Sequence, residues 1–131
     1  MLASPSAEQS AIASQLAAEL VSYGLGLHQL LERQWEPELY RALAEQFDRM
    51  QMLVAALPPL AVTWTELLIS RAELTHALWN LRAPTRINGR VEALHARHQA
   101  VAGELLELCG RYTRMRDRLS EPGAGPTPQG R

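Results

Sequence analysis

Several residue types are rare or absent in this sequence of 131 residues, and each absence narrows the choice of fold and function. There is no lysine, so all 13 basic residues are arginine, and aromatic residues make up only 5% of the chain. The single cysteine, Cys109, excludes an internal disulfide and fits a reducing compartment, where it would act as a small, partly buried apolar residue. Because Leu and Ala supply most of the 47% apolar content, helices are favoured over strands.

The sequence also lacks segments that would direct it to a membrane or out of the cell. Its start, MLASPSAEQS, has no basic region followed by an apolar core, and therefore predicts no secretory signal. The longest apolar run, Met52–Val62, is too short for a bilayer and contains two prolines. Acidic residues are in excess in 1–60 and arginines in 61–131, a balance that requires no nucleic-acid partner. We therefore expect a cytoplasmic protein without stable membrane insertion.

The strongest positive feature is an apolar stripe near the C-terminus, whose members alternate in steps of four and three. This period of 3.5 residues places them along one seam of a single long helix. A helix from Ile87 to Leu119 would be about 48 Å long at about 1.5 Å per residue, so other helices or a partner must cover the seam. The seam consists of Ile87, Val91, Leu94, His98, Val101, Leu105, Leu108, Tyr112, Met115 and Leu119.

Three further helices are predicted upstream. The first begins with Ser4 as its N-cap and Pro5 as its first residue, and Glu8 follows in the first turn, where the helix dipole favours an acid. Gly24 and Gly26 each weaken the middle of this helix by about 1 kcal/mol relative to Ala, and they mark either a kink or a close helix crossing. Its apolar stripe consists of Leu16, Leu20, Tyr23, Leu27 and Leu30.

A break around Pro37 predicts a second helix. Pro37 lacks a backbone donor and disfavours a helical Glu36, so Glu36 is expected to cap a helix that starts at Pro37. Trp35 would then pack on Tyr40. A kinked continuation of the first helix is the alternative. The stripe of the second helix consists of Tyr40, Leu43, Phe47, Met50, Val54 and Leu57, and the prolines at 58–59 end it.

The third helix is predicted to open at Thr63, which has capping-box spacing with Glu66, and to stop at Pro84. Its stripe includes one charged residue, Arg71. The stripe consists of Trp64, Leu67, Arg71, Leu74, Leu78 and Leu81, and Leu68, Ile69 and Trp79 widen the apolar surface.

The long final helix has two equally good starts: Asn88 can cap it, or it begins at Thr85 with Asn88 inside it. Residues 121–131 are rich in Pro and Gly and are predicted to be a disordered tail. No strand pattern or internal repeat occurs. The sequence therefore predicts an all-α fold, an antiparallel helical bundle or long helical hairpin of three to four helices, with one helical domain over residues 1–120.

Two Glu-x-x-His pairs, Glu73 with His76 and Glu92 with His95, resemble the ligand pairs of di-iron bundles, which project inward. In the frame of the predicted stripes these four residues do not face the core, so we expect no metal and no other cofactor. No Ser/His/Asp or Cys/His constellation, phosphate loop or CxxC motif is evident either. We therefore expect that the protein is not an enzyme.

Two polar features of the final helix have more than one interpretation. His98 is either a core-edge histidine that is hydrogen-bonded across the bundle or a polar contact to a bound partner. A group of arginines late in the helix favours a solvated C-terminus over a nucleic-acid patch, because Tyr112 and Met115 between them belong to the seam. An acidic docking surface on a partner protein is the remaining alternative. The arginines are Arg111, Arg114, Arg116 and Arg118.

Several short segments resemble those of a known family. They comprise a Leu/Glu-rich first half with a short break, an Asn-Gly near the start of the final helix, and a Gly-containing terminus. These segments are Leu30–Arg33, Ala42–Gln46, Asn88–Val91 with His95 and His98 downstream, and Thr127–Arg131. On these residues the chain resembles the FlgN-type flagellar export chaperones from Leu16 to its end.

This resemblance implies a chaperone without catalysis or cofactor. Such a protein would bind the amphipathic, unfolded C-terminal segments of hook–filament junction proteins, keep them unpolymerised and deliver them to the export apparatus. An amphipathic helix laid into an apolar groove is the expected binding mode. The alternatives are a homodimerising structural or signalling bundle without an export role, and a chaperone of another type III secretion system.

The seam of the final helix is the predicted partner-binding surface. That helix, at about 33 residues, is longer than the second and third helices, which run to about 20 residues each and cover only about 30 Å. Its C-terminal stretch is therefore left for a partner helix, since soluble monomers rarely expose long apolar patches. The predicted partner-binding residues are Val101, Leu105, Leu108, Tyr112, Met115 and Leu119.

Overall fold

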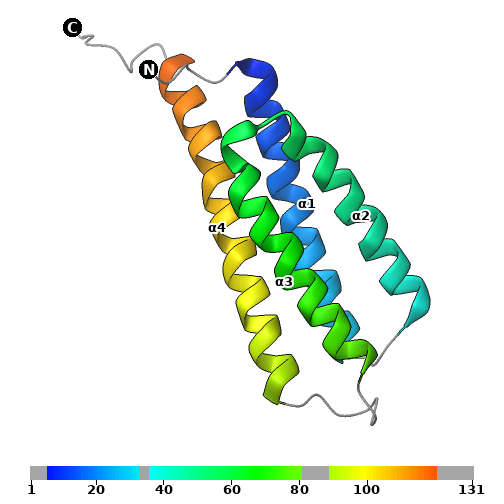
Figure 1. Ribbon diagram of the computed structural model, residues 1–131. Helices are drawn as coiled ribbons and strands as arrows, with labels where there is room; N and C mark the ends of the chain where they lie inside the picture. The colour runs from blue at the N-terminus through cyan, green and yellow to red at the C-terminus, as the bar shows by residue number, and fades with distance from the viewer. Residues whose placement is uncertain (1–5, 33–35, 81–88, 121–131) are drawn as a thin grey trace, which may run out of the picture.

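The computed structural model describes residues 6–32, 36–80 and 89–120, except for the side chains of 115–120. These residues form four antiparallel helices and one short 3-10 turn, and no strand occurs among them (Figure 1). The all-α, antiparallel bundle predicted from the sequence is therefore confirmed. The elements are α1 (Ala7–Glu32), α2 (Pro37–Ala55), η1 (Pro58–Leu60), α3 (Ala61–Trp79) and α4 (Gly89–Ser120). The predicted tail at 121–131 lies outside the described residues.

The core consists of the apolar stripes of all four helices. The most deeply buried side chains include Leu16 from α1, Phe47 from α2, Leu67 from α3 and Leu105 from α4. Burying one side chain of this size stabilises a fold by about 1.5–3 kcal/mol, so the four stripes hold the helices together. Most described members of each predicted stripe are therefore buried in the core, and the others are half-buried at its edge.

The start of α1 differs from the prediction. Ser6 Oγ accepts the backbone N–H of Gln9 at 2.9 Å, and Gln9 Oε1 accepts the backbone N–H of Ser6 at 3.1 Å. This reciprocal capping box fixes the first helical residue as Ala7, so the predicted start at Pro5 is wrong. Ser4 and Pro5 themselves lie outside the described residues. Glu8 lies in the first turn, as predicted.

The break between α1 and α2 is confirmed, because α2 begins at Pro37 with Glu36 as its N-cap and runs antiparallel to α1. The kinked continuation is therefore wrong. Gly26 lies at the crossing of these helices, where a Cβ atom would come within 2.7 Å of Leu43 Cδ2, whereas the space beside Gly24 is open. Trp35 lies outside the described residues.

The capping box predicted at Thr63 is wrong, because α3 begins two residues earlier at Ala61. The prolines at 58–59 do not simply end α2. They form η1, which turns the chain directly into α3. Leu57 and Leu60 at the ends of this turn are completely buried and fasten it to the core. The described part of α4 begins at Gly89, directly after the predicted cap position, and residues 81–88 lie outside the description.

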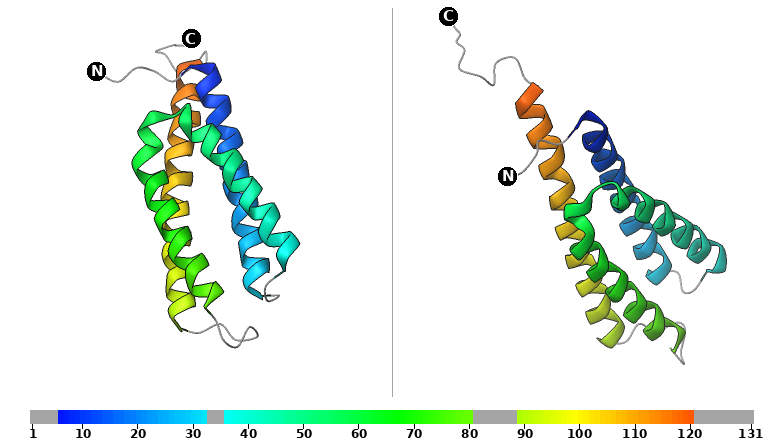
Figure 2. Two further views of the ribbon diagram at one scale, coloured as in Figure 1. Left: turned by 45° about the vertical axis from the view of Figure 1, so that its right-hand side comes forward. Right: turned by 45° about the horizontal axis from the view of Figure 1, so that its top comes forward.

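Among the described residues, the four helices leave one side of the bundle open. α4 packs along both α1 and α3, and α1 also packs along α2. α2 and α3 approach each other beside η1 and then diverge towards the far end of the bundle (Figures 1 and 2). No helix in the described part of the chain is long and apolar enough to cross a membrane.

Candidate partner-binding site

The diverging helices enclose an open hollow of about 370 Å³, which we call the α2–α3 groove. Beneath the hollow, a narrow crevice of about 20 Å³, room for about one water molecule, reaches Tyr23, Leu27 and Leu30 on α1. The wall of the hollow on α2 is Tyr40, and its wall on α3 consists of Leu68, Arg71, Ala72, Thr75, His76 and Trp79.

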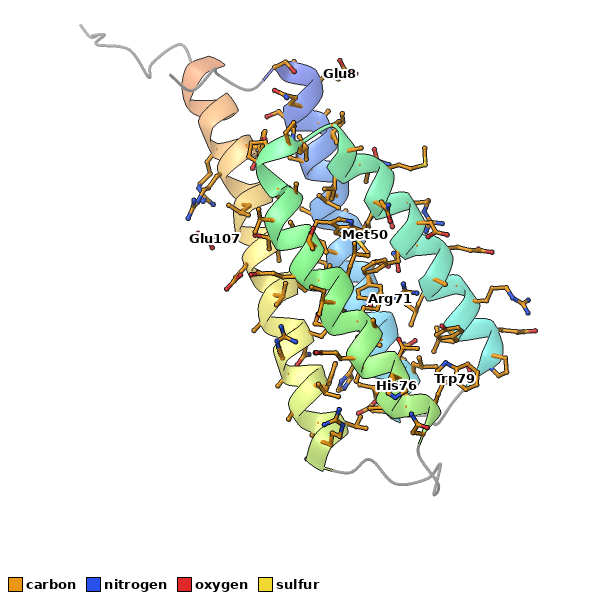
Figure 3. The ribbon with its side chains drawn as sticks, viewed as in Figure 1. Glu8, Met50, Arg71, His76, Trp79 and Glu107 are labelled. Carbon is orange, nitrogen blue, oxygen red and sulfur yellow. The ribbon has the colours of Figure 1, made fainter. Side chains whose placement is uncertain are left out.

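Aromatic rings set the width of the groove. Near its closed end, the rings of Phe47 and Trp64 stack with centroids 4.7 Å apart. At its open end, Tyr40 and Trp79 meet edge to face at 6.2 Å, and Trp79 remains 63% exposed. Figure 3 shows Arg71 and Trp79 in the space between α3 and α2. Among the described residues, the two helices are thus bridged by large side chains rather than closely packed.

The outer face of α3 carries a second seam with helical spacing. This seam begins at the α3 wall of the groove and extends along the exposed side of the helix. All its residues are exposed, including Val62 at 73% and Ile69 at 49%, and none is an acid or an arginine. A helix that is apolar on two sides is usually buried on both, whereas only one side of α3 is buried in the bundle. The seam consists of Val62, Thr65, Ile69, Ala72, His76 and Trp79.

Sequence reasoning noticed only part of this surface. Ile69 and Trp79 were visible as an extension of the apolar stripe of the third helix, but the same steps of three and four that define the core stripe also link them to Val62 and Ala72. A search for a second stripe at that spacing would have found the seam. The groove itself depends on α2, which no local pattern places beside α3.

Arg71, the charged member of the core stripe of α3, lies at the groove. Its guanidinium carbon is 4.3 Å from the centre of the Phe47 ring, a cation–π contact. Within the described residues no ion pair includes Arg71. Glu73, two residues further along, instead pairs with Arg97 on the α4 side of the helix. The groove therefore has a half-buried positive charge without an acidic partner.

Below the groove, a chain of hydrogen bonds links α1, α4 and α3. Ser70 Oγ donates to the backbone oxygen of Leu67 (3.0 Å), so His98 Nδ1 must donate to Ser70 Oγ (2.7 Å). His98 Nε2 then accepts from the Tyr23 hydroxyl at 2.9 Å. Both ring nitrogens are engaged inside the bundle. The interpretation of His98 as hydrogen-bonded across the bundle is confirmed, and its alternative as a partner contact is wrong.

Burial keeps this network uncharged at neutral pH. Burial, with smaller contributions from His95 and Arg71, lowers the pKa of His98 to about 4. Burial also raises the pKa of Tyr23, although the guanidinium of Arg71 partly offsets it. Ser70 is only 1% exposed and its hydroxyl proton is already donated, so this Ser–His pair is closed to a substrate. We assign the network to holding three helices together.

The partner-binding residues predicted on α4 lie in two different environments. Val101 and Leu105 are buried in the protein's own core. Leu108 and Tyr112 are half-buried, and Leu108 borders a hollow of about 460 Å³ between α3 and α4. The side chains of Met115 and Leu119 lie outside the description, although both residues are in α4. In the described part of this surface, only Leu108 and Tyr112 are open to a partner. That a partner binds there stays a prediction.

Cys109 lies beside this surface and is completely buried. Burial raises the pKa of its thiol to about 11, so it is almost wholly protonated at neutral pH and unreactive. It packs in the core as the predicted small apolar residue, but its burial is complete rather than partial. Of the arginines late in α4, Arg111 and Arg114 are exposed, and Arg114 lies 3.8 Å from Glu107, as expected of a solvated helix end.

The Glu-x-x-His pairs do not face the core. Glu73, His76 and Glu92 are exposed and His95 is half-buried, in agreement with the heptad frame. In the part of the chain that the structure describes, no three side chains of the His, Cys, Asp or Glu type gather as a metal site would require. The expectation that the protein binds no metal stays a prediction.

Comparisons of this chain with protein-family models, curated proteins and solved structures find no match.

Proposed function

We propose that this protein is a non-catalytic helical chaperone that captures an amphipathic helix of another protein in the α2–α3 groove. The single observation that carries the proposal is the side of the bundle that the described residues leave open. There α2 and α3 diverge over a hollow, and the exposed seam of α3 continues the apolar surface. A partner helix with apolar residues at every third and fourth position would fit between the two helices in the helix-in-groove mode.

The dimensions suit one added helix. α2 and α3 contain 19 residues each, which corresponds to about 28 Å of helix. A segment of similar length would cover Trp79 at one end of the groove and reach Leu68 near its middle. It would lie on the side of the bundle where α2 and α3 do not pack together. Such capture would hide the partner's apolar face and that of α3 together.

The identity of the partner is proposed from the sequence. The resemblance to FlgN-type chaperones favours the C-terminal segments of hook–filament junction proteins, which are amphipathic and must stay unpolymerised until export. In this proposal the complex forms in the cytoplasm and the segment is released at the export apparatus. A chaperone serving another type III secretion system would use the same groove for a different client.

A homodimerising bundle without an export role is the second candidate, and the seam of α3 favours it. An antiparallel copy of α3 centred between residues 70 and 71 would place large side chains against small ones, as good packing requires. In such a dimer, Val62 of one copy would face Trp79 of the other, Thr65 would face His76, and Ile69 would face Ala72.

Co-expression with the tagged C-terminal segment of a hook–filament junction protein, followed by co-purification, tests the proposal. We expect a stable complex with the wild type and none with Ala72→Arg, which places a charge in the groove. Ala100→Arg is the matched control, because Ala100 is also an exposed alanine, lies in the middle of α4 and does not line the groove. Loss of binding in both variants, or in neither, would argue against docking in the groove.

Two further measurements separate the alternatives. If Leu108→Arg abolishes binding while Ala72→Arg does not, the client docks on α4, as the sequence alone predicts. Sedimentation equilibrium of the protein without client tests the second candidate. A dimer that Ile69→Arg converts to a monomer, together with failure to bind the junction segment, would support the homodimer.

A further inference from the structure

Among the described residues that line the groove and the crevice beneath it, Arg71 is the only one that is Asp, Glu, Lys or Arg. It lines both spaces, because its side chain leaves the middle of α3 towards α2 (Figure 3). The walls on either side of it are formed by apolar or uncharged groups such as Leu68 and Thr75. A segment that enters the groove therefore meets this one permanent charge at its centre.

The charge of Arg71 is not compensated within the described bundle. Phe47 offers it a ring face and the Tyr23 hydroxyl a neutral hydrogen-bond partner, but no carboxylate pairs with it among the described residues. Glu73 pairs with Arg97 on the opposite flank of α3, and Glu19 accepts hydrogen bonds from α2 on the other side of the bundle. A half-buried guanidinium has lost part of its hydration, and a ring face and a neutral hydroxyl compensate its charge less than a carboxylate would.

We propose that the groove selects a helix that carries a carboxylate between two apolar turns, and that Arg71 binds this carboxylate. The inference rests on the proposed function, because it names the chemistry of the segment that the groove captures. Leu68 lies one turn before Arg71 and Thr75 one turn after it. Apolar residues one turn before and after the carboxylate of the bound helix would cover these two positions.

The guanidinium of Arg71 suits this task. It can donate two parallel N–H···O bonds to a carboxylate, a geometry that an ammonium group lacks. The attraction grows as the bound helix excludes water from the groove, since it scales inversely with the local dielectric constant. An apolar or amide residue at the same place would instead cover the charge and leave it without an anion.

Selection from a display library, with the full chain as bait, tests whether the groove prefers a helix with a central carboxylate. Each library member is an amphipathic helix of about 16 residues, roughly 24 Å long, with a fixed Leu/Ala stripe and one randomised central position. On the wild type we expect Asp and Glu to be enriched about tenfold over Asn and Gln at that position. On Arg71→Met, which keeps most of the side-chain volume, this preference should disappear.

A peptide from this selection then separates charge from packing. Changing its carboxylate to the matching amide should weaken binding to the wild type about tenfold and leave binding to Arg71→Met unchanged. Arg97→Met is the matched control, because Arg97 is an arginine outside the groove, and this variant should keep the tenfold difference. Thermal melts followed by circular dichroism check each fold, and Arg71→Gln replaces Arg71→Met if the latter does not fold.

Three outcomes would overturn the inference: no helix is selected, helices are selected without an acidic preference, or the preference persists on Arg71→Met. A dimer that Ala72→Arg dissociates would also overturn it, because a second copy would then fill the groove. If acidic helices are selected but the junction segment does not co-purify, the client identity fails and the inference stands. If the junction segment binds equally to Arg71→Met and to the wild type, the inference fails and the proposed function stands.

Discussion

The buried histidine on α4 makes the stability of this bundle depend on pH. In the unfolded chain His98 has its ordinary pKa of 6.5, whereas burial lowers it to about 4 in the folded protein. As the pH falls below 6.5, His98 becomes protonated in the unfolded state but stays neutral in the folded state until the pH approaches 4. The free energy of unfolding should therefore decrease between pH 6.5 and about pH 4, and this contribution should level off below pH 4.

The size of the effect follows from the shift. At about 1.4 kcal/mol per pKa unit, the difference between 6.5 and about 4 corresponds to a loss of about 3 kcal/mol over that range. Only part of this is reached by pH 5. Burial also lowers the pKa of His95, which adds a contribution of the same sign. For a domain of this size, a loss of 3 kcal/mol is a large fraction of the total stability.

Urea unfolding of the wild type and of His98→Leu at several pH values between 7 and 4.5, followed by circular dichroism, measures this. His98→Leu leaves the Tyr23 hydroxyl buried without an acceptor, which should cost about 1–3 kcal/mol at pH 7. The double variant Tyr23→Phe with His98→Leu removes that unpaired group and should recover part of the loss.

The test compares how steeply the free energy of unfolding falls with pH in the wild type and in His98→Leu. The stability of His98→Leu should fall less steeply between pH 6.5 and 5, a range in which most carboxylates have not yet begun to titrate. Equal slopes for the wild type and His98→Leu, or a wild type that is more stable at pH 5 than at pH 7, would refute the reasoning.

Four further predictions concern other parts of the bundle. Gly24→Ala should raise the free energy of unfolding by about 0.5–1 kcal/mol in urea, whereas Gly26→Ala should gain less, because its methyl group meets α2. Leu105→Arg should unfold the protein, whereas the Leu108→Arg variant should keep most of its helicity, since only Leu105 is completely buried. Circular dichroism measures the helicity of both variants. Cys109 should resist alkylation by iodoacetamide at pH 8 until urea is added. Elemental analysis of protein purified without chelators should find no stoichiometric transition metal; about one ion per chain would contradict this.

The sequence by itself determined the helices and their inward faces. Apolar residues at steps of three and four can bury together only on a helix, so the stripe through Leu16 and the stripe through Phe47 both indicated core positions. Pro37 determined where α2 begins, because its ring and missing donor act locally. The ends at Ser6 and Ala61 were misplaced, because several nearby residues can cap a helix and the surrounding packing selects among them.

Only the tertiary structure decided which helices are neighbours and which surfaces remain open. Helical spacing shows that one side of α3 is apolar, but it does not show that α4 covers one face while α2 diverges from another. Arg71 was an unexplained charge in a stripe until the fold placed the Phe47 ring and the Tyr23 hydroxyl against it. His98 likewise depended on Tyr23 and Ser70, which are distant in sequence and meet it only when α1 and α3 pack on α4. Spacing along a helix determines towards which side of that helix each side chain points, whereas contacts between helices depend on how all four helices pack.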